Sequence, residues 1–446
     1  MGNPALVCCE NILSMKNGQK GLVALTPLIV MLVVFLVGSL IAGDFYRIPI
    51  SLAFLVATIY AILIAPEKGL ARNVEKFSQG AGSTRILYMI WIFILAGAFA
   101  TSAKAMGAVD ATVELALRAI PSRFVPAGIF LATCFISMSI GTSVGTIVAL
   151  TPVVTGLAVK MGVDTAWMVA IVVGGAFFGD NLSFISDTTI AATQTQGCAM
   201  RDKFRTNLRL VAPAAIITLL VYILYGSSFG EVTSVDSTSA DIVKVLPYAL
   251  VIILALVGVN VLIVLTCGIV ATGIIGVGVG EVAFFDFTAS MGEGMCSMGE
   301  LIIVTMLAGG LLELVKAGGG LDYLVRGVTR NIRNRRGGEG AIALLTMLSN
   351  VCTANNTIAI LTIGDIARDI SQKFDISPRR SASIIDTTSC FVQGILPYGA
   401  QLLMASGLAK VSPVAIIPHL YYPACIGLMV AISIIFNRQG QSHTKN

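Results

Sequence analysis

The stretch GGAFFGDNLSFISDTTIAATQTQG, residues 174–197, places two carboxylates, Asp180 and Asp187, at the end of a long apolar run. No Lys or Arg lies between them, and Asn, Ser and Thr residues accompany them. A buried charge without a partner is costly, so a segment of this kind is typical of a functional site. What the two carboxylates can do depends on the medium that surrounds them.

The composition of the chain indicates a membrane protein. Of the 446 residues, 56% are hydrophobic and only 12% are charged, about half the charged fraction of a soluble domain. Apolar runs of roughly 18 or more residues predict membrane-spanning helices. Such runs cover residues 21–42, 48–65, 86–103, 208–226, 245–279 and 414–436. We therefore expect an all-α polytopic membrane protein with roughly 10–12 transmembrane segments.

Three pairs of matching segments indicate an internal duplication. LAGAFATSAKAMGAVD (95–110) matches LAGGLLELVKAGGGLD (307–322) at an offset of 212 residues. GTSVGTIVALT (141–151) matches CTANNTIAILT (352–362) at an offset of 211, and the segment 180–183 matches 386–389 at an offset of 206. The matches keep their order, so we expect two structural repeats, with Asp386 as the counterpart of Asp180.

Loop charges predict that the two repeats lie in opposite orientations. The loop before the first LAG segment is basic, with Arg72 and Lys76, whereas the loop before the second holds Glu281, Asp286 and Glu293 and no Lys or Arg. Basic loops mark the cytoplasmic side of a membrane protein. Inverted repeats with broken helices are typical of secondary transporters, which bind their cargo between the two repeats.

The repeats and the loop charges together predict how the chain is divided. We expect a cytoplasmic N-terminal segment (1–20), a first inverted repeat (21–226), an external linker (227–244), a second inverted repeat (245–436) and a cytoplasmic tail (437–446). Segments 108–120 and 321–335 are amphipathic and are expected at the membrane surface. The segment 165–195 is expected to re-enter the membrane, because Arg201, Lys203, Arg205 and Arg209 make the following loop basic.

Four polar stretches interrupt the apolar helices, at residues 139–146, 179–189, 350–357 and 386–399. Unwound backbone at membrane depth is tolerated where it is buried in protein or lines a wet cavity, and its free carbonyls can bind a small cation. The predicted ion- or substrate-binding residues are Asp180, Asn181, Ser183, Asp187, Thr188, Thr189, Thr142, Ser143, Asn355, Asn356, Asp386, Thr387 and Thr388. Their hard oxygen atoms suit Na⁺, for which the three aspartates are the predicted charged ligands.

The two carboxylates of the opening stretch suggest exchange chemistry. A poorly solvated carboxylate holds a proton more readily than one in water, and Na⁺ can compete for the same oxygen atoms. Asp180 and Asp187 would share one face of an unbroken helix, or lie on opposite arms if the helix breaks near residues 182–184. A purely structural role, as a helix cap or as a hydrogen-bonding group between helices, is the alternative for each polar residue.

Enzyme signatures are missing from the sequence. It contains no HExxH, no Walker A loop and no Gly-x-Ser-x-Gly elbow, and its nine cysteines show no metal-binding spacing. We therefore expect no enzymatic activity and no cofactor. Without a nucleotide-binding domain, transport would have to draw on an ion gradient.

The segment GDNLSFISDTT (179–189) resembles the Gly-Asp-x-x-Ser-Pro-x-Ser-Asp-Thr-Thr signature of the NhaC-type Na⁺/H⁺ antiporters, a family within the wider ion-transporter superfamily. Phe184 stands where that family usually has Pro, and the second repeat has one carboxylate, Asp386, where the family often has adjacent Glu and Asp. The resemblance implies an ion-coupled antiporter. Some relatives exchange Na⁺ or H⁺ for organic acids such as malate and lactate, and others move amino acids.

The residues and the resemblance together predict a secondary antiporter. It would exchange Na⁺ for H⁺ across the bacterial plasma membrane by alternating access, as a multi-pass protein with both termini in the cytoplasm. Its partners would be lipid, Na⁺ and protons, and glycine-rich faces would suit a homodimer; no nucleic acid is expected. The alternative function is Na⁺- or H⁺-coupled transport of a small organic acid or amino acid. A channel or a membrane-embedded enzyme is a further alternative.

Overall fold

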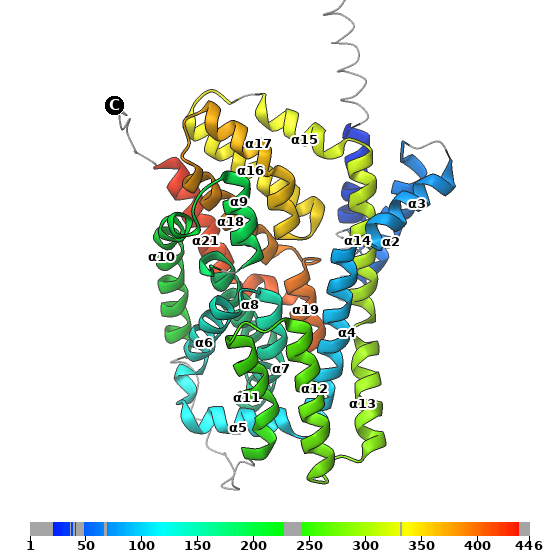
Figure 1. Ribbon diagram of the computed structural model, residues 1–446, viewed down its shortest axis with the longest axis vertical. Helices are drawn as coiled ribbons and strands as arrows, with labels where there is room; N and C mark the ends of the chain where they lie inside the picture. The colour runs from blue at the N-terminus through cyan, green and yellow to red at the C-terminus, as the bar shows by residue number, and fades with distance from the viewer. Residues whose placement is uncertain are drawn as a thin grey trace, which may run out of the picture.

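The computed structural model describes residues 21–35, 37–38, 41, 49–66, 69–184, 186–226, 242–330 and 332–436. Every regular element in these ranges is a helix (Figure 1). The predicted all-α class is confirmed. The predicted N-terminal segment, the cytoplasmic tail and residues 227–241 of the predicted linker lie outside the described residues.

The described helices make this a multi-pass membrane protein. Seven helical stretches within these ranges are long and apolar enough to cross a membrane, or eight if the bent pair Pro378–Ala409 and Pro413–His419 forms one span. Four shorter apolar helices accompany them: Gly21–Phe35, Ile50–Ile64, Ile242–Leu254 and Tyr421–Ile435. The predicted number of roughly 10–12 segments is reached only when these shorter helices are counted.

The helices of the two halves follow the same order. In the first half they are α2 Ile50–Ile64, α3 Leu70–Ala81, α4 Thr84–Ala105, α5 Ala108–Ala119, α6 Val125–Ile140, α7 Ser143–Met161, α8 Thr165–Leu182, α9 Asp187–Gln196 and α10 Met200–Gly226. In the second half they are α11 Ile242–Leu256, α12 Val261–Gly278, α13 Phe284–Ser297, α14 Gly299–Ala317, α15 Gly320–Thr329, α16 Arg335–Thr353, α17 Asn356–Lys373, α18 Pro378–Ile395, α19 Ala400–Ala409, α20 Pro413–Ile416 and α21 Tyr421–Ile435. From α3 to α9, each helix has its counterpart in α13 to α19.

Left-handed turn residues fix the alignment between the two halves. Gly141, between α6 and α7, has φ 74°, and Ala354, between α16 and α17, has φ 50°. Gly197 after α9 has φ 68°, and Lys410 after α19 has φ 54°. Residues other than Gly seldom adopt this conformation, so Ala354 and Lys410 mark positions that the repeated backbone requires. In each pair, the two residues are 213 positions apart in the sequence.

This alignment corrects the one made from the sequence. The offset of 212 for the LAG segments agrees with the structure, but the offsets of 211 and 206 are wrong by two and seven residues. At an offset of 213, the counterpart of Asp180 is Gln393 and that of Asp187 is Ala400. Asp386 therefore lies in the middle of α18 rather than at a helix break. Short runs of Asp, Asn, Ser and Thr match by composition, whereas turns define equivalent backbone positions.

The two halves are inverted relative to each other. Figure 1 shows α5 across the lower end of the molecule and α15 across the upper end, with α3 at the upper right and α13 at the lower right. The α6–α7 hairpin lies in the lower half and the α16–α17 hairpin in the upper half. This arrangement is the expected pair of inverted repeats, and α5 and α15 correspond to the two amphipathic segments predicted at the membrane surface.

The prediction that residues 165–195 re-enter the membrane is wrong. Helices α8 and α9 form one interrupted span, Thr165–Gln196, rather than a sharply bent pair. The tip of the α6–α7 hairpin turns back inside the molecule at the level of this break, where Ser143 N donates to Asp180 Oδ1. The expectation failed because the α6–α7 hairpin, rather than this segment, turns back inside the molecule, while Arg201, Arg205 and Arg209 stay exposed on α10.

Two glycine contacts join the halves. Helix α4 packs against α13, and α3 packs against α14. A Cβ atom on Gly97 would collide with the backbone oxygen of Gly294, and one on Gly80 would collide with that of Gly309. Gly97 corresponds to Gly309 at the offset of 212, so each of these two counterparts makes a close backbone contact with a glycine of the other half. Such contacts between small residues let membrane helices approach closely.

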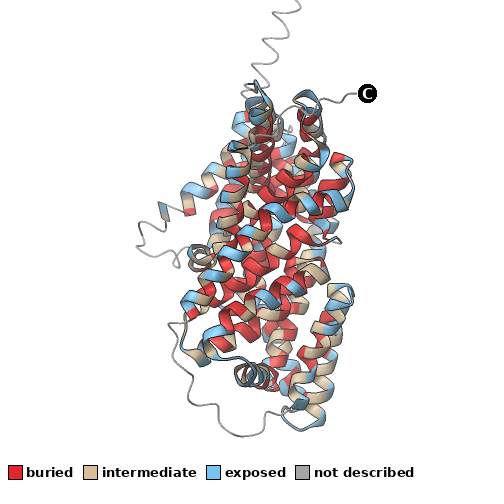
Figure 2. Ribbon diagram, turned by 90° about the vertical axis from the view of Figure 1, so that its left-hand side faces the viewer, coloured by how far each residue is buried: buried red, intermediate tan, exposed pale blue. Residues whose placement is uncertain are grey.

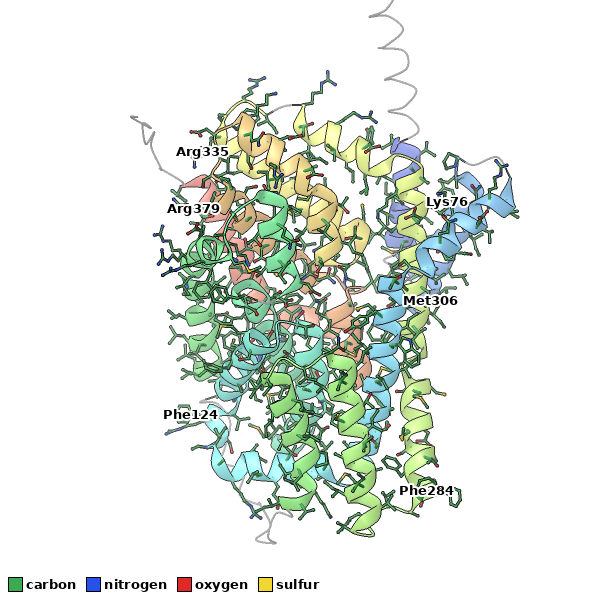
Figure 3. The ribbon with its side chains drawn as sticks, in the orientation of Figure 1. Lys76, Phe124, Phe284, Met306, Arg335 and Arg379 are labelled. Carbon is green, nitrogen blue, oxygen red and sulfur yellow. The ribbon has the colours of Figure 1, made fainter. Side chains whose placement is uncertain are left out.

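Burial and charge are divided along the molecule. Figure 2 shows buried residues through the middle of the bundle, with exposed residues on the outside and at the ends. The buried middle includes nearly all of α8 and a polar part of α18 around Asp386. Lys76, Arg335 and Arg379 lie towards one end and Phe284 lies at the other (Figure 3). Lys76, from the basic loop before the first LAG segment, therefore shares one end of the molecule with Arg335 and Arg379.

Candidate ion-binding site

The first helix break lies between α8 and α9, at residues 183–186. The backbone oxygen of Asp180 accepts hydrogen bonds from the hydroxyls of Thr188 and Thr189, each at 3.3 Å. The backbone oxygen of Asn181 accepts from Lys203 Nζ at 3.0 Å and from an amide group of α10. Side chains thus replace the helical N–H groups that these carbonyls lack at the break.

These side-chain hydrogen bonds explain how the helix can break without a proline at position 184. Phe184 is exposed and stacks on Phe204 of α10, with ring centroids 4.8 Å apart. Ser183 already has the extended backbone, φ −67° and ψ 138°, that a following proline would favour. Polar side chains from α9 and α10 therefore stabilise the open backbone that a proline would otherwise impose.

Asp180 is the buried carboxylate of this break, with 3% of its surface exposed. Its Oδ1 atom accepts a hydrogen bond of 3.1 Å from the backbone N–H of Ser143, the first residue of α7. Thr142 precedes it in an extended conformation and ends the hairpin turn. The amino end of α7 carries partial positive charge, which favours a carboxylate there. No Lys or Arg in the described chain forms an ion pair with Asp180.

Asp187 is placed differently, although it belongs to the same break. It is the first residue of α9 and is exposed, whereas Ser186 before it is buried. The hydroxyls of Ser186 and Thr188 lie 2.9 Å apart. Asp180 and Asp187 therefore stand on opposite sides of the break, as expected if the helix were interrupted there.

A cavity of about 770 Å³ connects the two halves at this level. Residues 141–144 and 355–357, from the tips of the two hairpins, contribute to its wall. Asp180 and residues 186–188 line it from the first break, and residues 400–401 line it from the start of α19. Seven of the predicted site residues lie on this wall: Thr142, Ser143, Asp180, Asp187, Thr188, Asn355 and Asn356.

The other six predicted residues do not line this cavity. Asn181 donates to the hydroxyl of Tyr422 at 3.0 Å and Ser183 is buried. Within α18, the hydroxyl of Thr387 bonds to the backbone of its own helix, and Thr388 is buried beside it. Thr189 and Asp386 belong to a polar cluster behind the cavity. The structure thus divides the predicted site into a cavity wall and a buried layer.

The buried layer contains an ion pair that the sequence analysis did not predict. Lys203 Nζ lies 2.8 Å from Asp386 Oδ2, and the two side chains are 1% and 0% exposed. Asn207 Nδ2 donates to the same carboxylate oxygen at 2.8 Å, and Lys203 also donates to Thr189 Oγ1 at 2.6 Å. A buried ion pair needs such additional hydrogen bonds to offset the cost of desolvation.

The sequence contains a signal for the burial of Lys203 and Asn207. Lys203 and Asn207 are four residues apart, and they continue the buried face of α10 that includes Leu210, Val211, Ala214, Thr218 and Tyr222. Residues spaced three or four apart share one face of a helix. The interpretation of Lys203 as a loop charge was therefore wrong, because its spacing places it on the inward face.

The second break, residues 396–399, contains Pro397 and Gly399 and has no charged side chain. Gln393 Nε2 donates to the backbone oxygen of Ala354 at 3.0 Å and to Gln401 Oε1 at 2.9 Å. Gln401 Nε2 donates to the hydroxyl of Ser143 at 3.0 Å. Neutral amides therefore connect the second break to the tips of both hairpins, and Gln401 was missed in the sequence analysis.

Comparison with known proteins identifies the family. The sequence matches the model of the Na⁺/H⁺ antiporter family over residues 18–227 and 232–438. The chain belongs to this family. The resemblance to NhaC-type antiporters is confirmed, and the chain is a transporter rather than an enzyme.

Relatives of the family align along most of the chain. The chain is 26% identical over 406 residues to the Na⁺/H⁺ antiporter NhaC of Bacillus subtilis, covering 83% of this chain and 86% of that protein. It is 24% identical to NhaC of Alkalihalophilus pseudofirmus, covering 79% and 82%. It is also 22% identical to the malate-2H⁺/Na⁺-lactate antiporter of Bacillus subtilis, covering 95% and 96%. The solved YdaH transporter of Alcanivorax borkumensis covers 87% of this chain at 12% identity and a TM-score of 0.39, too low to compare sites.

Proposed function

We propose that this chain exchanges Na⁺ for H⁺ across the bacterial plasma membrane, with Asp180 as the carboxylate that binds either ion. One observation carries the assignment: Asp180 is buried, has no cationic partner in the described chain and lines a cavity built from both repeats. A buried carboxylate of this kind requires a cation or a proton to offset its charge.

Competition between the two ions follows from the chemistry of one carboxylate. A proton on Asp180 removes the negative charge that Na⁺ requires, and Na⁺ on the carboxylate opposes protonation. The hydroxyls of Ser143 and Thr188 and the carboxylate of Asp187 line the same cavity and supply further hard oxygen atoms. Asp187, exposed to the cavity, would raise the local concentration of cations at its mouth.

The inverted repeats provide the means of alternating access. In each half, the second arm of the hairpin packs against the short helix after the break of the other half: α7 against α19, and α17 against α9. The tips of both hairpins line the cavity. Figure 1 shows the α6–α7 hairpin in the lower half of the molecule and the α16–α17 hairpin in the upper half. Exchange of the conformations of the two halves would therefore open the cavity to the opposite side of the membrane.

The test uses purified protein in sealed liposomes that contain a pH-sensitive dye. A proton gradient is imposed, and Na⁺ is added without any organic solute. Na⁺ should collapse the gradient, whereas the bulky cation N-methyl-glucamine should not. Asp180→Asn should remove the response, while Asp110→Asn, an exposed carboxylate on α5, should retain it. Retention of the response in folded Asp180→Asn would exclude Asp180 as the exchange site.

A second candidate function is exchange of a small organic acid or amino acid. The cavity, about 770 Å³, is far larger than one dehydrated ion and falls in the range of small-molecule sites. The helices α7, α9, α17 and α19 all begin at its wall, and helix amino ends favour anionic groups. If Na⁺ alone leaves the proton gradient intact, this candidate replaces the first, and carboxylates and amino acids are tested next.

We also propose that the end with Lys76, Arg335 and Arg379 faces the cytoplasm and that both termini lie there. Basic residues favour the cytoplasmic side. In a cysteine-free variant, an impermeant thiol reagent applied to intact cells should label Phe284→Cys but not Arg335→Cys; the reverse pattern would invert the topology.

Formation of a homodimer is a separate proposal, which the mass of the detergent-solubilised protein would test.

A further inference from the structure

The ammonium group of Lys203 is held by three oxygen atoms from three different sources. They are Asp386 Oδ2 at 2.8 Å, the backbone oxygen of Asn181 at 3.0 Å and Thr189 Oγ1 at 2.6 Å. The carboxylate belongs to α18, the carbonyl is freed by the first break, and the hydroxyl belongs to α9. The lysine side chain itself is 1% exposed, so solvent contributes little to its solvation.

These are the donor types that bind an alkali cation in proteins. A carboxylate, a carbonyl freed from its helix and a hydroxyl are hard oxygen ligands, which suit Na⁺. Three further oxygen atoms of the cluster, Asp386 Oδ1, Asn181 Oδ1 and Asn207 Oδ1, are buried without a hydrogen-bond partner in the described chain. The cluster therefore offers more oxygen lone pairs than the lysine and its neighbours use.

The cluster adjoins the cavity through one hydroxyl. Thr189 accepts from Lys203 and donates to the backbone oxygen of Asp180, the carboxylate that lines the cavity. Thr188, the preceding residue, lies on the cavity wall. A cation at Asp180 and the ammonium of Lys203 would thus bind to neighbouring parts of the same helix break.

We propose that these oxygen atoms form a second cation site, which Lys203 occupies with its own ammonium group and which accepts Na⁺ when that group is absent. The site lies outside the exchange at Asp180, and the inference would stand even if the cargo were organic. Lys203 acts here as a permanently attached cation. Asp386 is neutralised by the lysine and adds no sodium ion to the transport stoichiometry.

The test measures equilibrium binding of radioactive Na⁺ to detergent-solubilised full-length protein at neutral pH. Lys203→Ala should bind one additional sodium ion per chain relative to the unchanged protein. The double variant Lys203→Ala with Asp386→Asn should lose this additional ion, because the charged ligand is gone. Lys160→Ala, which removes an exposed lysine at the end of α7, should bind as the unchanged protein does. Equal Na⁺ binding by folded Lys203→Ala and unchanged protein would overturn the proposal.

Thermal unfolding provides a readout independent of transport. Na⁺ should raise the Tm of Lys203→Ala more than that of the unchanged protein, whereas N-methyl-glucamine should not. The double variant should fold in either salt and show no added effect of Na⁺. If the double variant folds but Lys203→Ala cannot be recovered even in Na⁺, then Na⁺ does not replace the ammonium and the proposal fails. A failure of the Na⁺/H⁺ exchange assay leaves these outcomes unchanged, so the two proposals are tested separately.

Discussion

The two helix breaks share a backbone but differ in chemistry. Both follow a helix of 18 residues and precede a helix of 10 residues that ends in a left-handed turn. The first break carries Asp180 and is stabilised by Lys203 and by threonine hydroxyls. The second contains Pro397 and Gly399, and its neighbouring side chains are the amides of Gln393 and Gln401. The two breaks therefore have equivalent helices around them, but only the first break has the carboxylate groups of Asp180 and Asp187 beside it.

The second repeat contributes its carboxylate to the first break. Asp386 lies in the middle of α18, and its partner Lys203 also binds the backbone of Asn181 at the break between α8 and α9. The two inverted repeats thus have similar helix arrangements, but the polar groups at their two breaks differ. The charged groups therefore lie at the first break, whereas the amides of the second break connect the hairpin tips.

The largest expected difference between the breaks concerns transport. Asp180→Asn should slow Na⁺-driven proton movement at least ~100-fold, equivalent to roughly 3 kcal/mol, because the charged ligand is lost. Gln393→Leu, at the counterpart position, should slow it far less, because no charge is removed. Rates in dye-loaded liposomes measure both. Similar losses in the two variants, at equal amounts of folded protein, would contradict the comparison.

The next effect concerns stability at the first break. Lys203→Met should lower the free energy of unfolding by about 3–5 kcal/mol in the absence of Na⁺, because Asp386 is left buried without its cation. The double variant Lys203→Met with Asp386→Leu should recover most of this loss, since both charges are removed together. Unfolding in detergent measures the change. A single variant as stable as the unchanged protein would show that the ion pair contributes nothing.

A smaller loss is expected at the second break. Gln393→Leu should lower the free energy of unfolding by about 1–3 kcal/mol, because the backbone oxygen of Ala354 loses its amide donor. The same unfolding measurement compares it with Lys203→Met. If Gln393→Leu proved the more damaging of the two, the neutral break rather than the charged one would hold the bundle together.

The smallest effect is expected at position 184. Phe184→Pro should retain exchange and change the free energy of unfolding by less than about 1 kcal/mol, because Ser183 already has a compatible backbone and the lost contact is an exposed stack on Phe204. Transport and unfolding measured together test this. Loss of exchange in a folded Phe184→Pro protein would mean that the first break depends on its present shape in a way these contacts do not explain.

Much of the fold could be predicted from local sequence signals. Apolar runs predicted the long helices, and the matched LAG segments predicted α4 with α14 and the surface helices after them. The single apolar run 245–279 is too long for one span, so its length alone requires a break. The structure places that break at Gly258, with φ 83°. These features depend on length, periodicity and glycine, all of which a single sequence displays.

The buried layer of the site could not be predicted in the same way. The alignment of Asp386 with Asp180 rested on similar polar letters, and only the turns at Ala354 and Lys410 show the true register. Lys203 sits among arginines that suggested a loop. Its spacing marks the inward face of α10, but its partner Asp386 comes from α18, which packs against α10 only in the folded bundle. Which charge pairs with which is a property of the packed helices rather than of any one segment.

The most direct test of the central claim is proton release on Na⁺ binding. Purified protein in weakly buffered detergent solution is titrated with Na⁺ while the pH is recorded. Competition at Asp180 predicts that the unchanged protein and Gln393→Leu release protons as Na⁺ binds, and that Asp180→Asn releases none. Proton release from folded Asp180→Asn equal to that of the unchanged protein would contradict the assignment of ion exchange to the first break.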